Sequence, residues 1–466
     1  MEFPQDNPIV KLWEEIKAAS GTLEDAIERV TAPEFAEALT EADVIGLGKT
    51  CEEARGLDDR PEDLTPLARL NFEGARAGDG VSEAAKRATA VCYLNVAPTV
   101  GPVALRAQHD VATAALGWAD RDGDPALWAS LRSHQGDALD SLGERHAAKV
   151  AFDDALGIYM ALAEGEPQAF RDHVAMTYNN LGNVLSDIGE RQEAEHAFGK
   201  ALHIYRTLAK EEAPAFRPEV AMVLNNLGNV LRAVGKQQNA KSACHEALGL
   251  YETLADEEPG KFRDDVAMAH NNLGSVLSDM GERQEAMDEC QKALDLYRTL
   301  ADGGSEEFVP DVAGALSNVS VLQGHTDDPQ GALESAEEAA DIAKGCGAGK
   351  IEALARQAQG KALTALSRHN EARRAYERAY DLASAQTDLA QAQTNAKWID
   401  AVCLNAKPDV VCRRLWDDFG QDLAEMAETK AKSDELVEVN IKRQASLSRG
   451  AGKGELVIAR QWASFT

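Results

Sequence analysis

The sequence predicts an all-α protein, a right-handed superhelical solenoid of antiparallel helix pairs. Two observations lead to this prediction. Identical residues return with a fixed step of 46 residues, and apolar residues within each repeat recur at helical spacing. A repeat of this length is one supersecondary unit that cannot bury its apolar face alone, so neighbouring units must stack. The residues that carry the period are Tyr159, Tyr205, Tyr251 and Tyr297; Phe170, Phe216, Phe262 and Phe308; and Gly143, Gly189, Gly235 and Gly281.

The composition agrees with a helical protein whose core is built from Leu, Ala and Val. Hydrophobic residues make up 44% of the 466 residues, but aromatic residues only 5%. The formal net charge is -30. Phosphate binding needs a basic face, and an anionic membrane surface repels an acidic protein. We therefore expect no nucleic-acid partner and no membrane partner.

The cysteines and the N-terminus favour a cytoplasmic protein. The seven cysteines form no CxxC pair. Cys244 and Cys290 occupy the repeat position of Phe198, so we expect them to fill the core in reduced form. The N-terminal segment lacks a basic region followed by an apolar stretch, and no apolar run approaches the length that crosses a bilayer.

The N-terminal region, residues 1–126, is expected to be a helical region of divergent repeats or a cap. Residues 9–78 and 82–126 both have helical patterns, but they do not keep the strict period. Terminal repeats are usually atypical, because their outer face meets water.

The unit at 218–255 shows why each repeat is a helix pair. Pro218 suits the first turn of a helix, and an apolar stripe follows it at helical spacing. Gly235 tolerates a left-handed conformation and should end that helix. A second periodic stretch buries Tyr251, and Phe262 should pack against its own repeat from the next loop.

The strict repeats are followed by weaker ones, which sets the expected organisation of the chain. Residues 315–345 lose part of the pattern, and residues 351–385 restore it. We therefore expect a solenoid at 127–385, with four strict 46-residue repeats and then degenerate ones. Helices at 387–404 and 408–440 are expected to form a C-terminal cap at 386–440, and a flexible basic tail is expected at 441–466.

The repeat resembles the tetratricopeptide repeat. In residues 181–202, Leu181 and Gly182 stand for the family's Leu-Gly pair, and Ala194, Phe198 and Ala201 stand for its second-helix positions. Arg206 replaces the Pro that usually ends the second helix, so that helix should run two turns further. This long form is similar to the repeats of kinesin light chains and of many bacterial tetratricopeptide repeat proteins.

The predicted function is a non-catalytic scaffold that holds a protein or peptide. The candidate site is a polar stripe on the first helices, opposite the buried Leu-Gly side. Asn amides donate and accept hydrogen bonds at once and are suited to the backbone of an extended peptide. The resemblance implies the same, because related repeats bind peptides in their concave groove. The predicted binding residues are Met176, Asn179, Asn180, Asn183, Met222, Asn225, Asn226, Asn229, Arg232, Asn271, Asn272, Ser275 and Asn318.

The same amides have a second interpretation, in which they link adjacent first helices and fix the superhelical pitch. Both roles can hold together. Arg232 is the main cation of the stripe, and Asp187 and Asp279 lie at its edge. Because a clamp for a terminal carboxylate needs positive charge, a neutral or basic peptide segment fits better. The methionines can be adaptable contacts or core residues.

No catalytic, metal or cofactor site is predicted. The segment GLGKT at 46–50 lacks the first glycine of a phosphate loop, because Asp43 stands there. The histidines form no HExxH motif, and a structural role is expected for Cys403 and Cys412.

An alternative function comes from the last residues of the sequence. The segment ELVIARQW at 455–462 faintly resembles the opening of a metallo-β-lactamase-fold domain. The chain would then be a regulatory subunit, or the N-terminal part, of a bacterial effector enzyme such as a protease or metallo-hydrolase. The partner's identity and the oligomeric state are left open.

Overall fold

The computed structural model describes residues 3–19, 22–55, 64–96, 102–211, 215–258, 260–326 and 328–385, together with Asn395. Within these residues the secondary structure is helical and contains no strand. The chain divides into two compact units, Met1–Val234 and Gly235–Thr466. The predicted helices at 387–404 and 408–440 and the tail at 441–466 fall outside the described residues, apart from Asn395.

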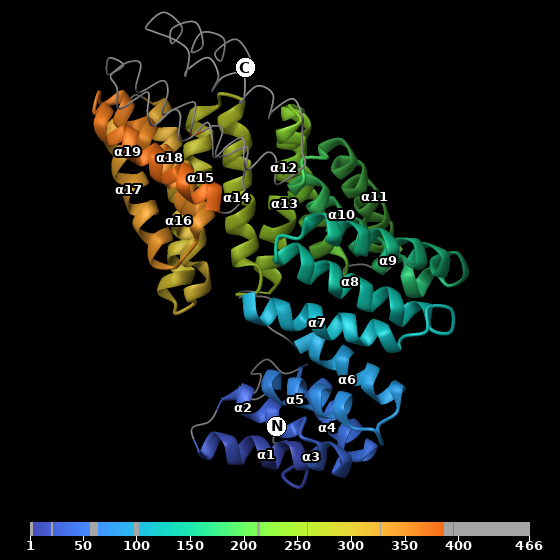
Figure 1. The fold of residues 1–466 in the computed structure, drawn as a ribbon. Helices are drawn as coiled ribbons and strands as arrows, with labels where there is room; N and C mark the ends of the chain where they lie inside the picture. The colour runs from blue at the N-terminus through green and yellow to red at the C-terminus, as the bar shows by residue number, and fades with distance from the viewer. Residues whose placement is uncertain are drawn as a thin grey trace, which may run out of the picture. The chain divides into compact units, whose positions relative to one another are not determined.

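The first unit holds twelve described helices (Figure 1). Their bounds are α1 (Pro8–Ala18), α2 (Leu23–Val30), α3 (Pro33–Ala38), α4 (Glu41–Arg55), α5 (Leu64–Ala77), α6 (Glu83–Val96), α7 (Pro102–Trp118), α8 (Pro125–Ser141), α9 (Arg145–Gly165), α10 (Pro167–Asp187), α11 (Arg191–Glu211) and α12 (Arg217–Ala233).

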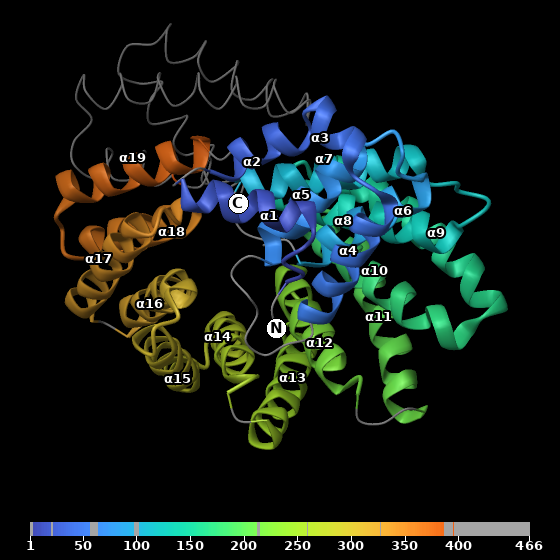
Figure 2. The ribbon, with the colours of Figure 1, turned by 90° about the horizontal axis from the view of Figure 1, so that it is seen from below.

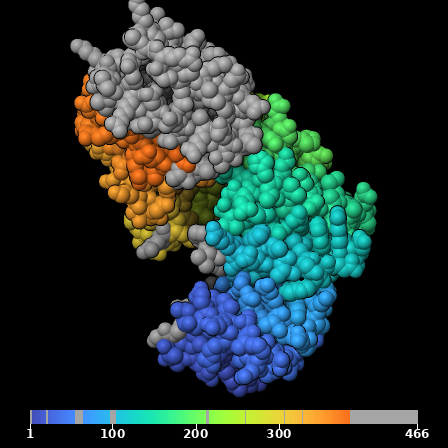
Figure 3. Space-filling view, viewed as in Figure 1, coloured from blue at the N-terminus to red at the C-terminus, as the bar shows by residue number. Residues whose placement is uncertain are grey.

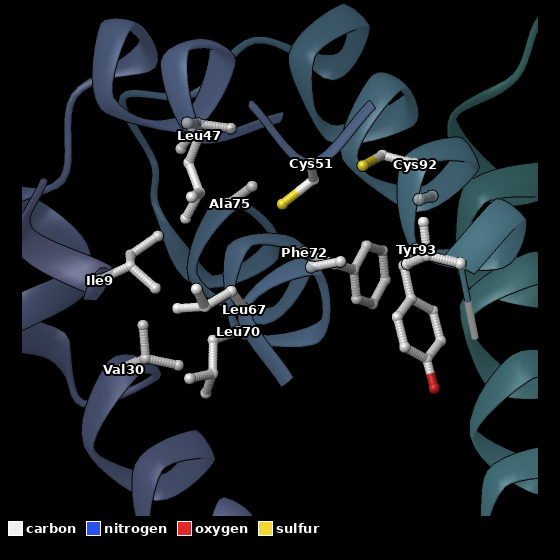
Figure 4. Close-up of a cluster of buried hydrophobic side chains, with 14 of the residues drawn as sticks. Ile9, Val30, Leu47, Cys51, Leu67, Leu70, Phe72, Ala75, Cys92 and Tyr93 are labelled. Atoms are coloured by element: carbon white, nitrogen blue, oxygen red, sulfur yellow. The ribbon is translucent and has the colours of Figure 1, made fainter. Parts of the chain in front are cut away.

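The N-terminal helices of this unit share one hydrophobic core. Ile9 from α1, Leu47 from α4 and Phe72 from α5 are all fully buried in it (Figure 4). The first helix is capped by Asn7, whose side-chain oxygen accepts from the backbone N–H of Ile9 at 2.9 Å. In the space-filling view these helices, in blue, form one closely packed body (Figure 3).

The helix pairs α8–α9 and α10–α11 are the predicted repeats. Each is held together by a glycine that lets an aromatic ring approach the first helix. A Cβ built on Gly182 of α10 would lie 2.8 Å from the Phe198 ring of α11, and Gly136 has the same relation to Phe152. This contact joins the glycine of the Leu-Gly pair to the aromatic position of the second helix. Arg206 also continues its helix, because α11 extends to Glu211.

The turn between the two helices of a repeat requires glycine. Gly143 and Gly189 have φ of 81° and 87°, a left-handed conformation that side chains rarely adopt. The N–H of Glu190 then reaches back to the carbonyl of Leu185 at 2.8 Å and closes the end of α10. The predicted helix stop is confirmed at these positions.

The second unit continues the helix pairs (Figure 2). Gly281 adopts the left-handed turn conformation with φ of 77°, and Phe262 is buried directly before α14. Cys290 replaces the aromatic ring opposite Gly274 and is fully buried, which confirms its role as a core residue. The described helices are α13 (Gln237–Glu257), α14 (Arg263–Asp279), α15 (Arg283–Asp302), η1 (Glu306–Phe308), α16 (Val309–His325), α17 (Pro329–Gly345), α18 (Gly349–Ala365) and α19 (His369–Ala385).

Candidate functional site

The predicted polar stripe lies on the first helices of the repeats. These are α8, α10 and α12 in the first unit and α14 and α16 in the second. On α10, Leu181, Gly182 and Leu185 are buried, and the stripe occupies the opposite side of the helix. We call the stripe the amide face, defined by Asn179, Asn180, Asn183, Asn225, Asn226 and Asn229 in the first unit and by Asn271, Asn272, Ser275 and Asn318 in the second.

On α10 the predicted residues divide into exposed and buried members. Met176 is 53% exposed, and Asn183 is also open to solvent. Asn180 is half-buried. Asn179 is only 3% exposed, so it lies in the packing between helices rather than on an open surface.

On α12 the division is similar. Asn225 is 1% exposed and belongs to the packed interior. Met222, Asn226, Asn229 and Arg232 are half-buried. The position one turn after each buried Asn, held by Asn183 and Asn229, is therefore the more accessible part of the face.

The amides of the first unit connect neighbouring first helices. The side-chain NH2 group of Asn226 donates to the side-chain oxygen of Asn179 at 3.1 Å, which links α12 to α10. The NH2 group of Asn180 donates to Asp137 at 2.9 Å and links α10 to α8. Asn179 in turn donates to Asn180 at 3.3 Å. These contacts give the amides the helix-linking role.

The second unit repeats this arrangement. The NH2 group of Asn318 on α16 donates to the side-chain oxygen of Asn271 on α14 at 2.9 Å and lies 3.5 Å from the Ser275 hydroxyl. Asn271, Asn272, Ser275 and Asn318 are all half-buried. In both units the donor comes from the later helix.

The hydrogen bonds leave acceptors unused on the amide face. Among the described residues, no protein group donates to the side-chain oxygen of Asn226 or of Asn318. An amide oxygen accepts up to two hydrogen bonds. At Asn226 and Asn318 the NH2 group is used for the link between helices, so these two side chains offer their oxygens as acceptors.

Asp137 is a residue of this face that the sequence analysis missed. It stands 46 residues before Asn183, so the repeat period alone could have found it. Its side chain is exposed to solvent, but desolvation by the surrounding protein disfavours the charged form and raises its pKa to about 7. The charge of Asp140 adds to this, and the hydrogen bond from Asn180 opposes it.

The remaining sequence motifs do not form a second site on the described residues. Residues 46–50 lie inside α4, so GLGKT is not a phosphate loop between a strand and a helix. No group of three metal-ligating side chains comes together in the described ranges. Within the same ranges, every helix is too short or too polar to cross a membrane. Cys403 and Cys412 fall outside the described residues.

Comparison with known proteins identifies the repeat. Models of the tetratricopeptide repeat match residues 174–213 and 219–299. No curated protein matches the chain. Among solved structures, the Rap conjugation gene regulator of the plasmid pLS20, in complex with the Phr* peptide, is similar at 13% identity. That match covers 89% of this chain and 96% of the other, with a TM-score of 0.52.

Two further solved structures match at lower scores. BtubC of P. vanneervenii matches at 20% identity over 52% of this chain and 92% of its own, with a TM-score of 0.41. Aspartyl phosphate phosphatase F of Bacillus subtilis matches at 11% identity over 94% and 97%, with a TM-score of 0.49. Residues 174–213 and 219–299 are therefore tetratricopeptide repeats, and their helix pairs and glycine contacts agree with this match.

Proposed function

We propose that this chain is a non-catalytic interaction protein and that a unit binds an extended peptide along its own part of the amide face. The observation that carries the proposal is the set of unused amide oxygens, because a peptide in extended conformation presents backbone N–H groups at regular intervals. The buried Asn179 and Asn225 would hold the helices in register. The open oxygens of Asn226 and Asn318 would contact the ligand together with Asn183 and Asn229.

The chemistry of the face favours a neutral or basic peptide. A surface rich in acceptors prefers a ligand rich in donors, such as Lys or Arg side chains. Asp137 adds a carboxyl group to the same face, and it accepts a hydrogen bond from the uncharged side chain of Asn180. Arg232 is the main cation among the predicted residues. The net charge of -30 would also speed the approach of a cationic ligand at low salt.

Apolar contacts would add affinity at one edge of the face. Met176 exposes 53% of its surface on α10, one turn before Asn180. A methionine side chain is flexible and polarisable and can adapt to different ligand side chains. The Rap regulator, whose fold is similar, was solved with a bound peptide, and this supports a peptide as the class of ligand.

A peptide-display selection on the full chain tests the proposal. We expect enriched peptides to carry Lys or Arg, and we expect the double variant Asn183→Ala with Asn229→Ala to weaken their binding about tenfold, the loss of one or two hydrogen bonds. Fluorescence polarisation with a labelled selected peptide gives the Kd. Asn239→Ala is the matched control, because Asn239 is an exposed amide on a second helix.

Two results would contradict the proposal. One is a selection that enriches no peptide. The other is a selected peptide that binds the double variant and the Asn239→Ala control with the same Kd. The alternative function, as part of an effector enzyme, depends on residues 455–462, which lie outside the described residues.

A further inference from the structure

Two thiols meet in the N-terminal core of the first unit. Cys51 on α4 and Cys92 on α6 lie near one another in this core (Figure 4). Their side chains are 0% and 3% exposed. The two thiols are hydrogen-bonded to each other, and the Cys92 sulfur also lies 3.7 Å from the carbonyl oxygen of Gly48, one turn before Cys51. The Cys92 sulfur therefore lies beside the turn of α4 that carries Cys51.

A cleft leads to one of these thiols. It lies between α4 and α6, has a volume of about 730 Å³, and is lined mainly by small and apolar side chains that include Ile45, Ala88 and Val91. Ile45 is 41% exposed, so this surface is open. Cys92 and Gly48 belong to the cleft wall, whereas Cys51 does not line it. A small molecule in the cleft would meet Cys92 first, with Cys51 behind it.

We propose that Cys51 and Cys92 form a dithiol modification site, which a small disulfide such as oxidised glutathione converts to an intramolecular disulfide. The Cys92 thiolate attacks one sulfur of the reagent, forms a mixed disulfide and releases one thiol. Cys51, after losing its proton, attacks the Cys92 sulfur and releases the second thiol. The two protein thiols are oxidised together, and the reagent disulfide is reduced to two thiols.

The surroundings of Cys51 make the second step slow and dependent on pH. Its hydrogen bond with Cys92 and its burial raise the pKa of the Cys51 thiol, and the charge of Glu52 on α4 adds to this. Lys49 and Glu53 of α4 and Arg87 of α6 line the cleft, and Asn71 of α5 lies next to Gly48. Only the thiolate attacks, so the rate should rise about tenfold for each pH unit below the pKa.

The bond would fix α4 to α6 and so restrain the cleft. Cys51 and Cys92 lie 41 residues apart in the sequence (92 minus 51), and a cross-link of that span reduces the freedom of the unfolded chain. Cys290 provides an internal comparison. It is also fully buried, and burial raises its pKa to about 12, but it packs against Gly274 within its own helix pair.

Differential alkylation of the folded full chain tests the site. Among the cysteines that the structure describes, Cys346 has the exposed thiol, and Cys346→Ser removes it so that it cannot join two copies. After hours in oxidised glutathione, the chain is denatured, alkylated and digested, and its peptides are analysed by mass spectrometry. We expect a peptide that contains Cys51 linked to Cys92, formed faster at higher pH, while Cys290 stays free.

Two variants resolve the order of events. In Cys51→Ala the reaction should stop at a mixed disulfide on Cys92. In Cys92→Ala the Cys51 thiol should stay free, because it does not line the cleft. The proposal is overturned if both thiols of the Cys346→Ser chain remain free after this treatment, or if Cys51 is modified as fast in Cys92→Ala as in the parent.

Discussion

At the scale of single residues, the repeated positions act through close packing. Gly182 is needed because the Phe198 ring occupies the space of a side chain, and Gly189 is needed because its φ of 87° excludes most side chains. The 46-residue period identifies both glycines in the sequence, but only the structure shows that they are required for different reasons.

Replacing Gly182 by Ala should destabilise the first unit by about 1–3 kcal/mol, because the added methyl group would overlap the buried Phe198 ring. Gly199→Ala is the matched control. It lies in the interior of α11 with open space around it, and alanine should stabilise that helix by about 0.5–1 kcal/mol. Urea unfolding measures both changes. Equal midpoints for the two variants would contradict the packing argument.

Asp137 should make stability depend on pH. Its pKa is raised from 3.8 to about 7 in the folded chain, so the folded state binds more protons than the unfolded state between these values. The free energy of unfolding should therefore fall as the pH rises from about 4 to about 7. The variant Asp137→Asn has no titrating carboxyl group here and should lose this pH dependence.

A comparison of the Asp137→Asn variant with the parent isolates the contribution of this carboxyl group to the free energy of unfolding. The advantage of Asp137→Asn over the parent should grow across the same pH window and stay constant above it. Urea midpoints measured from pH 4 to pH 8 check this. Parallel curves for variant and parent would show that the carboxyl group titrates normally in the folded chain.

At the scale of elements, α10, the first helix of its repeat, carries two kinds of asparagine on nearly the same face. Asn179 is buried and accepts from Asn226 of the next first helix, whereas Asn183, one turn later, is open to solvent. Helical spacing predicts the stripe but not this division, because burial depends on how closely the neighbouring helix approaches. The two predicted roles of the amides, peptide binding and helix linking, therefore both use side chains of this face.

Asn179→Ala should cost about 1–3 kcal/mol, because it leaves the half-buried NH2 group of Asn226 without its acceptor. Asn183→Ala should stay within about 0.5 kcal/mol of the parent, since its side chain is exposed. Thermal or urea unfolding distinguishes the two. A similar loss for both would mean that the exposed amide is also structural.

At the scale of the whole molecule, the helix pairs belong to two compact units. In such repeat arrays stability is close to a sum of local and nearest-neighbour terms. A defect in one repeat should therefore act mainly on its neighbours rather than on the full chain.

Hydrogen exchange followed by mass spectrometry tests this locality. In Gly182→Ala we expect faster exchange in α10 and α11, with α17, α18 and α19 unchanged from the parent. Those last helices belong to the second unit and carry their own glycine contact, between Gly360 and Tyr376. Uniformly faster exchange throughout the described helices would show that the chain unfolds as one cooperative body.

The sequence by itself determined the helix pairs, their period, the turn glycines and the location of the polar stripe. These features follow from spacing along one chain, because helical periodicity and the left-handed preference of glycine act locally. The tertiary structure decided which amides are buried and which acceptors stay open. It also raised the pKa of Asp137 and brought Cys51 next to Cys92. These properties arise between helices distant in the sequence, so the distances and desolvation behind them exist only after packing.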